Sequence, residues 1–130
     1  MKPHQSELRI YYAHSKILYG TQQEIDEFGF LQNKFSKATI ICPHTTVGEL
    51  NDSNDYLHVV DCCNKIIASE LNGFIGLGVF VEIARALSNN ITAFVLRRSA
   101  NGFVLLEVSG IEIVNKNDWK VKYGKIIVNK

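Results

Sequence analysis

The feature that most constrains the fold is a regular alternation of apolar runs with helix-like segments between residues 8 and 97. Four short runs rich in β-branched and other apolar residues occur at 8–13, 38–42, 65–69 and 91–97. Between them, apolar side chains recur at helical spacing over about 21–35, 55–63 and 78–88. Strands that are apolar along nearly their whole length are typical of a parallel sheet with helices on both faces. The sequence therefore predicts an α/β fold, a doubly wound, mostly parallel, flavodoxin-like sheet with three helices.

The C-terminal part of the chain has a different pattern. Its segments FVLLEV, IEIV and KIIV are apolar or alternating, show no helical period, and are separated by turn residues such as Gly110 and Gly124. This pattern predicts a β extension, a hairpin that adds strands to the sheet edge or serves a partner chain. A chain of 130 residues has the usual size of one domain. We expect a single domain over 1–130, with a core at about 8–98 and the extension at about 101–130.

Composition and charge exclude several classes of partner. The formal net charge is +1, so no long-range field attracts nucleic acid or an anionic membrane. No run approaches the ~18 apolar residues of a membrane span, and the N-terminus has no apolar leader segment. The three cysteines, with Cys62 and Cys63 adjacent, lack the spacing of metal ligands. We therefore expect a cytoplasmic protein with free thiols and with no membrane or nucleic-acid partner, cofactor or metal; a redox or nucleophilic cysteine is the alternative.

Polar residues follow the predicted strands where an open α/β sheet places its ligand crevice, at the carboxyl ends of the strands. In chain order these candidates are His14, Ser15, Lys16, His44, Thr45, Thr46, Glu70, Arg97, Arg98 and Ser99. A histidine there can act as a general acid near neutral pH, and an arginine can neutralise an anionic group such as phosphate. The alternatives are a loop histidine bonded to nearby backbone and a solvated arginine at the end of a strand.

A glycine-rich turn precedes the third predicted helix, and one carboxylate lies just inside that helix. The turn carries Gly73, Gly76 and Gly78, and the carboxylate is Glu82. Glycines let a backbone approach a ligand closely, and free N–H groups at a helix start favour electronegative groups. We expect the helix dipole to lower the pKa of Glu82 and to orient it into the crevice, where it could bond sugar hydroxyls or attack an anomeric carbon. The alternative is that Glu82 satisfies the helix N-terminus from an exposed position.

Two stretches carry a family resemblance: IYYAHS near the N-terminus, and GLGVFVEIARALSNN around the third helix. Together they resemble the nucleoside 2-deoxyribosyltransferase family and its N-glycosidase relatives. In that family a glycine is followed four residues later by the catalytic glutamate, an aliphatic residue and a small residue, with an alanine two further on. The same spacing is made here by Gly78, Glu82, Ile83, Ala84 and Ala86. The order of elements agrees as well, so the resemblance covers about residues 8–97.

The resemblance implies cleavage or transfer at the N-glycosidic bond of a nucleoside or nucleotide. Glu82 would be the nucleophile that forms a glycosyl-enzyme intermediate, and Tyr11 would lie near it in the sugar site. By their positions after the predicted strands, and not by the resemblance, we also place the three glycines and Arg97 in the substrate site. The resemblance also implies a homo-oligomer, because family members assemble active sites across subunits.

The chain departs from the family pattern in its acids. Asn64 stands where the family usually has an aspartate before the third strand, so we place Asn64 in the substrate site. The glycine loop lacks a second acid to handle the leaving base, for which Glu70 is the nearest candidate by role and His14 a possible replacement. A protein that keeps the pocket without the acid would bind and sequester a nucleotide or a nucleotide-derived signal. A third alternative is an oligomeric protein whose terminal strands chiefly serve a partner.

Overall fold

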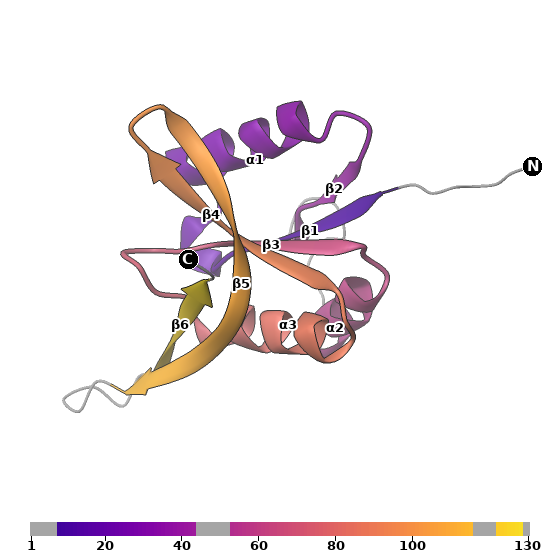
Figure 1. Cartoon of the computed structure of the whole chain (residues 1–130), viewed down its shortest axis with the longest axis vertical. Helices are drawn as coiled ribbons and strands as arrows, with labels where there is room; N and C mark the ends of the chain where they lie inside the picture. Colours follow the sequence, from indigo (N-terminus) through magenta and orange to yellow (C-terminus); the bar gives the residue numbers. More distant parts are fainter. Residues whose placement is uncertain (1–7, 44–52, 116–121, 129–130) are drawn as a thin grey trace, which may run out of the picture.

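The computed structural model describes residues 8–43, 53–115 and 122–128. The N-terminal elements are β1 (Arg9–Ala13), a short 3-10 helix η1 (Lys16–Leu18), α1 (Gln22–Lys34), β2 (Thr39–Ile41) and α2 (Ser53–Asp61). They are followed by β3 (Lys65–Ser69), α3 (Leu77–Ser88), β4 (Thr92–Ser99), β5 (Gly102–Asn115) and β6 (Lys122–Val128). Figure 1 shows the sheet running between α1 on one side and α2 with α3 on the other.

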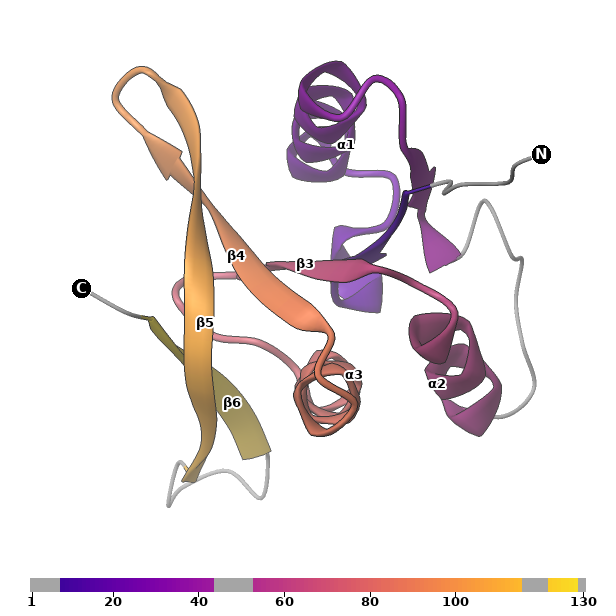
Figure 2. The same cartoon turned by 45° about the vertical axis from the view of Figure 1, so that its right-hand side comes forward.

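The six strands form one mixed sheet in the order β2-β1-β3-β4-β5-β6. The pairings among β2, β1, β3 and β4 are parallel, whereas β5 is antiparallel to both β4 and β6. Figure 2 shows how β5 and β6 curl the sheet into a half-barrel that bends toward α3. The prediction of a doubly wound, mostly parallel, flavodoxin-like sheet is therefore wrong.

The physical reason lies in the connection after β4. A parallel strand needs a crossover of a dozen or more residues, but only a tight turn with Gly102 at φ 126° separates β4 from β5. The 14 residues of β5 then serve two partners, since its first half pairs with β4 and its second half pairs with β6. An irregularity between Val108 and Gly110 marks the change of partner, and such bulges bend a strand and increase its twist. Strands β5 and β6 are thus a large part of the sheet.

The two faces of the sheet are packed by different helices. Because successive strand residues point to opposite faces, Tyr11 and Tyr12 of β1 enter separate clusters of buried side chains. Tyr12 packs with Leu31 of α1, and Tyr11 packs on the face covered by Ile83 of α3. Each of these four side chains is completely buried, so β1 is held from both sides.

The end of the chain closes over α3. Ile126 of β6 is buried in the same cluster as Ile83 of α3. Gly124 exchanges two backbone hydrogen bonds with Ile75, of 2.7 and 2.9 Å, just before α3 begins. A Cβ atom at Gly124 would lie 2.7 Å from Phe80 Cδ2 and 2.8 Å from Ile75 Cγ1, so only glycine fits this contact. The hairpin thus fixes the segment from which α3 starts.

Across the ranges that the structure describes, none of the helices combines the length and the apolar character needed to cross a membrane.

Candidate functional site

A cleft of about 580 Å³ opens at the carboxyl end of β1, between the η1 turn, α2 and the first turns of α3. Its described lining consists of His14, Ser15, Lys16, Tyr19, Pro43, Tyr56, Leu57, Leu77, Gly78, Val79, Val81 and Glu82. The lining is mostly apolar, with a small number of hydroxyl, amine and carboxylate groups. This composition is typical of a small-molecule site.

Glu82 lines this cleft and is hydrogen-bonded to Tyr11, which is completely buried and lies outside the lining. Val79, Ile83 and Ala86 are the buried residues of α3, and their packing turns Glu82 toward β1. The Tyr11 hydroxyl donates a 2.6 Å hydrogen bond to Glu82 Oε2, joining two residues 71 positions apart in the chain. The structure therefore brings together the two residues that the resemblance assigns to one site.

The surroundings of Glu82 change its acidity. Burial raises the pKa of Glu82 to about 7, and the hydrogen bond from Tyr11 opposes this shift only in part. Burial and the neighbouring carboxylate raise the pKa of the Tyr11 phenol, so Tyr11 stays a donor. The expected lowering of the Glu82 pKa by the helix dipole is thus wrong, because Glu82 is the sixth residue of α3, beyond its first turn, and desolvation dominates. Near neutral pH the carboxyl group exists in both forms, which suits acid–base or nucleophilic work.

The three glycines of the turn have three different roles. Gly78 lines the cleft, and a Cβ atom there would meet no atom within 4 Å. Gly76 is the N-cap of α3, and a Cβ atom there would lie 3.1 Å from Ser15 Oγ, so it lets the η1 turn approach α3. Gly73 is exposed, with φ 84°, in a tight turn between Leu71 and Phe74 that lies outside the cleft lining. Only Gly78 thus faces the cleft directly.

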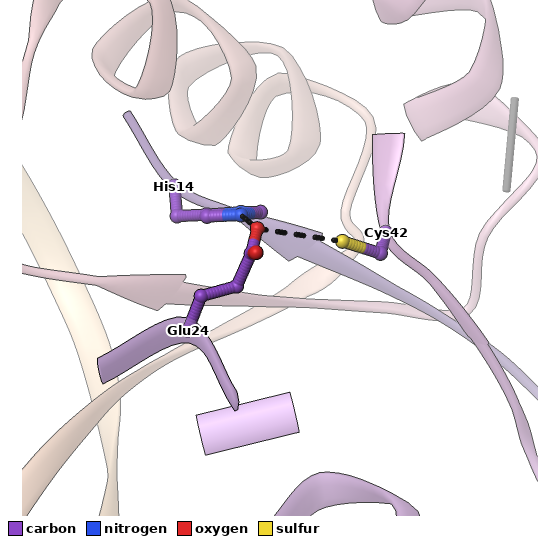
Figure 3. A group of neighbouring side chains, drawn as sticks. All are labelled: His14, Glu24 and Cys42. Atoms are coloured by element: carbon purple, nitrogen blue, oxygen red, sulfur yellow. Dashed lines mark hydrogen bonds and ion pairs between the residues drawn. The ribbon is translucent and has the colours of Figure 1, made fainter. Parts of the chain in front are cut away.

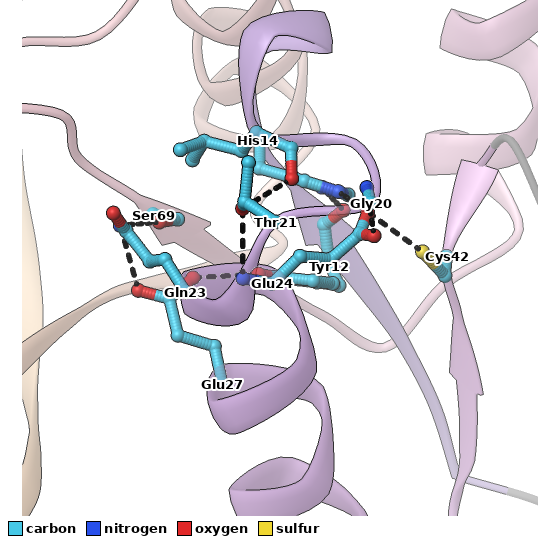
Figure 4. A network of polar contacts seen from close by, with 10 residues as sticks. Tyr12, His14, Gly20, Thr21, Gln23, Glu24, Glu27, Cys42 and Ser69 are labelled. Carbon is cyan, nitrogen blue, oxygen red and sulfur yellow. Dashed lines mark hydrogen bonds and ion pairs between the residues drawn. The ribbon is translucent and has the colours of Figure 1, made fainter.

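His14 lines the cleft, but its ring nitrogens bind protein groups behind it. Figure 4 shows Nε2 next to Glu24, where the distance to Glu24 Oε2 is 2.6 Å. Nδ1 lies 3.1 Å from the carbonyl oxygen of Tyr12, and the ring stacks on the Tyr12 ring at 4.1 Å. Because a carbonyl only accepts, Nδ1 carries a proton. His14 is therefore held rigidly between β1 and α1.

Glu24 is a residue that sequence reasoning missed in this role. A carboxylate in the first turn of a helix already has a local explanation, its attraction to the helix dipole. Thr21 caps α1 by accepting from the Glu24 N–H, the local pattern of an N-cap followed three residues later by glutamate. The Glu24 side chain instead accepts from the Gly20 N–H at 2.8 Å and meets His14. The spacing of Thr21 and Glu24 marks the start of α1, but nothing in it indicates the contact with His14.

Two tyrosines of the cleft were not predicted either, whereas Lys16 was one of the polar residues expected after the first strand. Tyr19 follows η1, Tyr56 belongs to α2, and Lys16 is exposed at the rim. Burial raises the pKa of Tyr19 to about 12, so its hydroxyl stays protonated at neutral pH. No motif in the sequence distinguishes Tyr19 and Tyr56 from ordinary surface or core positions.

Glu70 and Arg97 are brought to each other rather than to Glu82. Arg97 donates from Nε to Glu70 Oε1 at 2.8 Å and from a terminal nitrogen to Oε2 at 3.0 Å. Neither residue belongs to the cleft lining. The carboxyl ends of β3 and β4 are neighbours, and their two opposite charges form a bidentate ion pair.

The remaining candidates lie elsewhere. Asn64 directly precedes β3, and its Oδ1 accepts from the Arg9 N–H at 2.6 Å. This contact ties the amino-terminal ends of β1 and β3 together, at the edge of the sheet opposite to the cleft. Ser15 does line the cleft. His44 lies outside the residues that the structure describes.

Neither protein-family models nor curated proteins give a match to this sequence.

Proposed function

We propose that the protein cleaves or transfers the N-glycosidic bond of a nucleoside or nucleotide, with Glu82 as the nucleophile. The observation that carries the proposal is the 2.6 Å hydrogen bond from Tyr11 to Glu82, a carboxylate that lines a cleft of about 580 Å³. A cleft of this volume can hold a nucleoside. Tyr11 orients one carboxylate oxygen and leaves the other for the substrate.

The first chemical step forms a bond between a Glu82 oxygen and the anomeric carbon of the sugar. The bond between that carbon and the base nitrogen breaks, its electron pair leaves with the base, and the base takes up a proton. In the second step, water or another base attacks the anomeric carbon and the bond to Glu82 breaks. The carboxylate is restored, and the attacking group loses its proton. Water gives hydrolysis, whereas a second base gives transfer.

The proton for the leaving base must come from a different group. Besides His14, the cleft lining offers three side chains that can donate a proton: Lys16, Tyr19 and Tyr56. Among the described residues, Glu82 is the only carboxylate in that lining. Glu70, the acid expected for this role, is paired with Arg97. This pairing favours the second candidate function, a protein that binds and sequesters a nucleotide or a nucleotide-derived signal without cleaving it.

The test is to incubate the purified chain with nucleosides, nucleotides and dinucleotides and to follow free base by chromatography. Glu82→Gln is run beside the wild type, with Glu112→Gln as the control because Glu112 is exposed on β5. Base release by the wild type and the control but not by Glu82→Gln supports catalysis and names the substrate. A compound that binds tightly and is recovered intact supports sequestration. Release that is unchanged in Glu82→Gln contradicts the proposed nucleophile.

The proposal includes a cytoplasmic location and a homo-oligomer. Cys42, Cys62 and Cys63 are free thiols, which are usual in a reducing compartment. Leu77 and Val81, on one side of α3 at the cleft, are 45% and 46% exposed. A neighbouring subunit would cover these apolar side chains, as the family resemblance implies. Gel filtration coupled to light scattering measures the assembly directly.

A further inference from the structure

Three chemically different ligand groups converge beside the cleft. They are the imidazole of His14, the carboxylate of Glu24 and the thiol of Cys42, called here the His14 cluster. The possible donor atoms of the three side chains all lie within 4.8 Å of one another, and all three residues are buried. Figure 3 shows Glu24 Oε2 between the His14 ring and the sulfur of Cys42. Its distances are 2.6 Å to His14 Nε2 and 3.9 Å to Cys42 Sγ.

The fold positions these side chains from three separate elements. His14 directly follows β1, Cys42 directly follows the neighbouring parallel strand β2, and Glu24 lies in the first turn of α1. Each strand thus delivers its side chain at the same edge of the sheet, and the helix covers the gap between them. Such a cluster, fixed by long-range structure, is pre-organised and needs little ordering to bind a ligand.

The outer contacts of the His14 cluster are those of a metal site. The Nδ1–H group of His14 donates to the carbonyl of Tyr12, which leaves Nε2 as the coordinating nitrogen. The second oxygen of Glu24 accepts from the Gly20 N–H, which fixes the orientation of the carboxylate. Ligating histidines and carboxylates are usually held by hydrogen bonds of this kind.

We propose that the His14 cluster binds a divalent transition-metal ion of the zinc type. A nitrogen, an oxygen and a sulfur ligand suit Zn²⁺ and Co²⁺, whereas Mg²⁺ and Ca²⁺ prefer oxygen ligands alone. A carboxylate, a thiolate and a neutral imidazole together neutralise the two charges of the ion, as a buried site requires.

The distances need only a small adjustment to reach the bound geometry. Tetrahedral zinc with ordinary bond lengths separates its ligand atoms by about 3.3 to 3.6 Å. His14 Nε2 and Glu24 Oε2 must therefore move apart slightly, while Glu24 Oε2 and Cys42 Sγ must approach. His14 is also part of the cleft lining, so a fourth position on the ion can face the cleft and hold water or a ligand. Three protein ligands with one open position are typical of catalytic zinc.

A purely structural interpretation of the cluster makes a different prediction. The His14–Glu24 hydrogen bond, with the weaker one from the Cys42 thiol to Glu24, could exist only to tie the ends of β1 and β2 to α1. Such a polar cluster would give no zinc affinity and no cobalt band. Metal binding requires that thiol, and it also produces an absorption band from charge transfer between thiolate and Co²⁺. The role of Cys42 therefore separates the two interpretations.

The experiment titrates the full-length chain, stripped of metal by a chelator and kept reduced with a phosphine, with Zn²⁺ and with Co²⁺. We expect one ion per chain, with zinc affinity tighter than about 1 µM. Cobalt should give the thiolate charge-transfer band. Cys42→Ser should weaken zinc binding at least about 100-fold and remove the band, because even changing an outer contact of a metal site weakens binding about 10- to 100-fold.

Two matched variants locate the metal. Cys62→Ser removes an exposed thiol, and Cys63→Ser removes a buried one whose pKa is raised to about 11 by burial. Both should keep the wild-type affinity and the cobalt band.

Circular dichroism checks that each variant is folded, and Glu24→Gln provides a second ligand change should Cys42→Ser fail to fold. Zinc affinity of the wild type weaker than about 100 µM, or binding that survives both ligand changes, overturns the proposal. The readout is metal binding alone, so the result does not depend on the proposed catalytic function.

Discussion

Strand β1 carries two tyrosine–glutamate pairs with the same chemistry on opposite faces of the sheet. Tyr11 donates to Glu82 of α3 at 2.6 Å, and Tyr12 donates to Glu27 of α1 at 2.5 Å. The two tyrosines are adjacent in the chain and both are completely buried. The pairs differ in what surrounds the carboxylate.

On the α1 face, the carboxylate is sealed into a polar network. Glu27 is only 4% exposed, and its second oxygen accepts from Gln23. Gln23 in turn donates to Ser69 and to the backbone carbonyl of Glu70, as Figure 4 shows in part. On the α3 face, Glu82 instead lines a cleft. The comparison shows that a buried tyrosine–glutamate hydrogen bond by itself has a structural role. The Tyr11–Glu82 pair is a candidate site because Glu82 can be reached from the cleft.

The largest expected difference between the pairs is in turnover. Glu82→Gln should lower base release by more than about 10³-fold, because an amide cannot form the glycosyl ester. Glu27→Gln should keep most of the activity and instead lower the free energy of unfolding by about 1 kcal/mol, since the Tyr12 bond then loses its charged acceptor. Both variants are compared by base release and by urea denaturation. Equal losses of activity would show that the two pairs do not differ in function.

The second expected difference is in pH dependence. Only ionised Glu82 attacks the sugar, so turnover should rise with pH through about 7 and be about 100-fold lower at pH 5 than at its plateau. The pKa of Glu82 in the folded chain lies above its ordinary value near 4.5, so the folded state binds the extra proton. Stability from this group is therefore present at low pH and is lost as pH rises through about 7.

Glu82→Gln tests the same shift without a substrate. The variant has no carboxyl group to titrate at this position, so it should gain stability relative to the wild type between pH 5 and pH 8. Urea denaturation at the two pH values measures this difference. A constant difference between variant and wild type would show that Glu82 is not titrating in that range.

Local patterns were sufficient to predict most elements of the fold. Residues 65–69 were predicted as a strand and form β3 with the same bounds, and the predicted helix at 78–88 is α3, Leu77–Ser88. These segments succeed because their periodicity is decided by neighbours a few residues away. The fold class failed because it depends on which strand β5 joins. An apolar run such as 103–108 has the same local pattern in a parallel, an antiparallel or a partner-bound strand.

The site was predictable in part from a motif and in part from the strand ends, since His14 and Ser15 were expected after the first strand and line the cleft. The resemblance names Tyr11 and Glu82 together, and the structure joins them. Glu70 was placed correctly after the third strand, whereas Arg97 lies inside β4, which continues to Ser99. The sequence pattern does not say that these two charges pair with each other. Asn64 was placed in the substrate site because it stands where the family usually has an aspartate. Asn64 precedes the start of β3, so it lies at the edge of the sheet opposite to the cleft, where it contacts Arg9.

The third prediction concerns β6, which covers only the face that carries Glu82. Gly124→Ala should lower the free energy of unfolding by about 1–3 kcal/mol, because its methyl group would collide with Ile75 and Phe80. Gly110→Ala is the matched control on β5, where the nearest atom, Ile127 Cδ1, is 4.0 Å away and the change should be within about 0.5 kcal/mol. Urea denaturation of both variants measures the contrast. Similar values for the two glycines would mean that β6 does not depend on this close contact.

The smallest expected difference is seen when one hydroxyl is removed from each pair. Tyr12→Phe leaves the sealed Glu27 with one donor fewer and should cost about 1–2 kcal/mol of stability. Tyr11→Phe should cost less, because water in the cleft can replace the lost donor of Glu82. Thermal or urea unfolding of the two variants gives the order. A larger loss for Tyr11→Phe would contradict the view that the α3 pair is the one open to solvent.

Tyr11→Phe has a further consequence that Tyr12→Phe lacks. The hydrogen bond from Tyr11 is the interaction that lowers the Glu82 pKa against the effect of burial. Removing it should raise that pKa further, so the acid limb of the activity profile moves to higher pH by less than about one unit. The profile of Tyr12→Phe should stay where the wild type has it, because Tyr12 lies on the other face of β1. If the acid limb of Tyr11→Phe does not shift, the ionisation that controls turnover is not that of Glu82. The Tyr11–Glu82 pair would then have only a structural role, like the Tyr12–Glu27 pair.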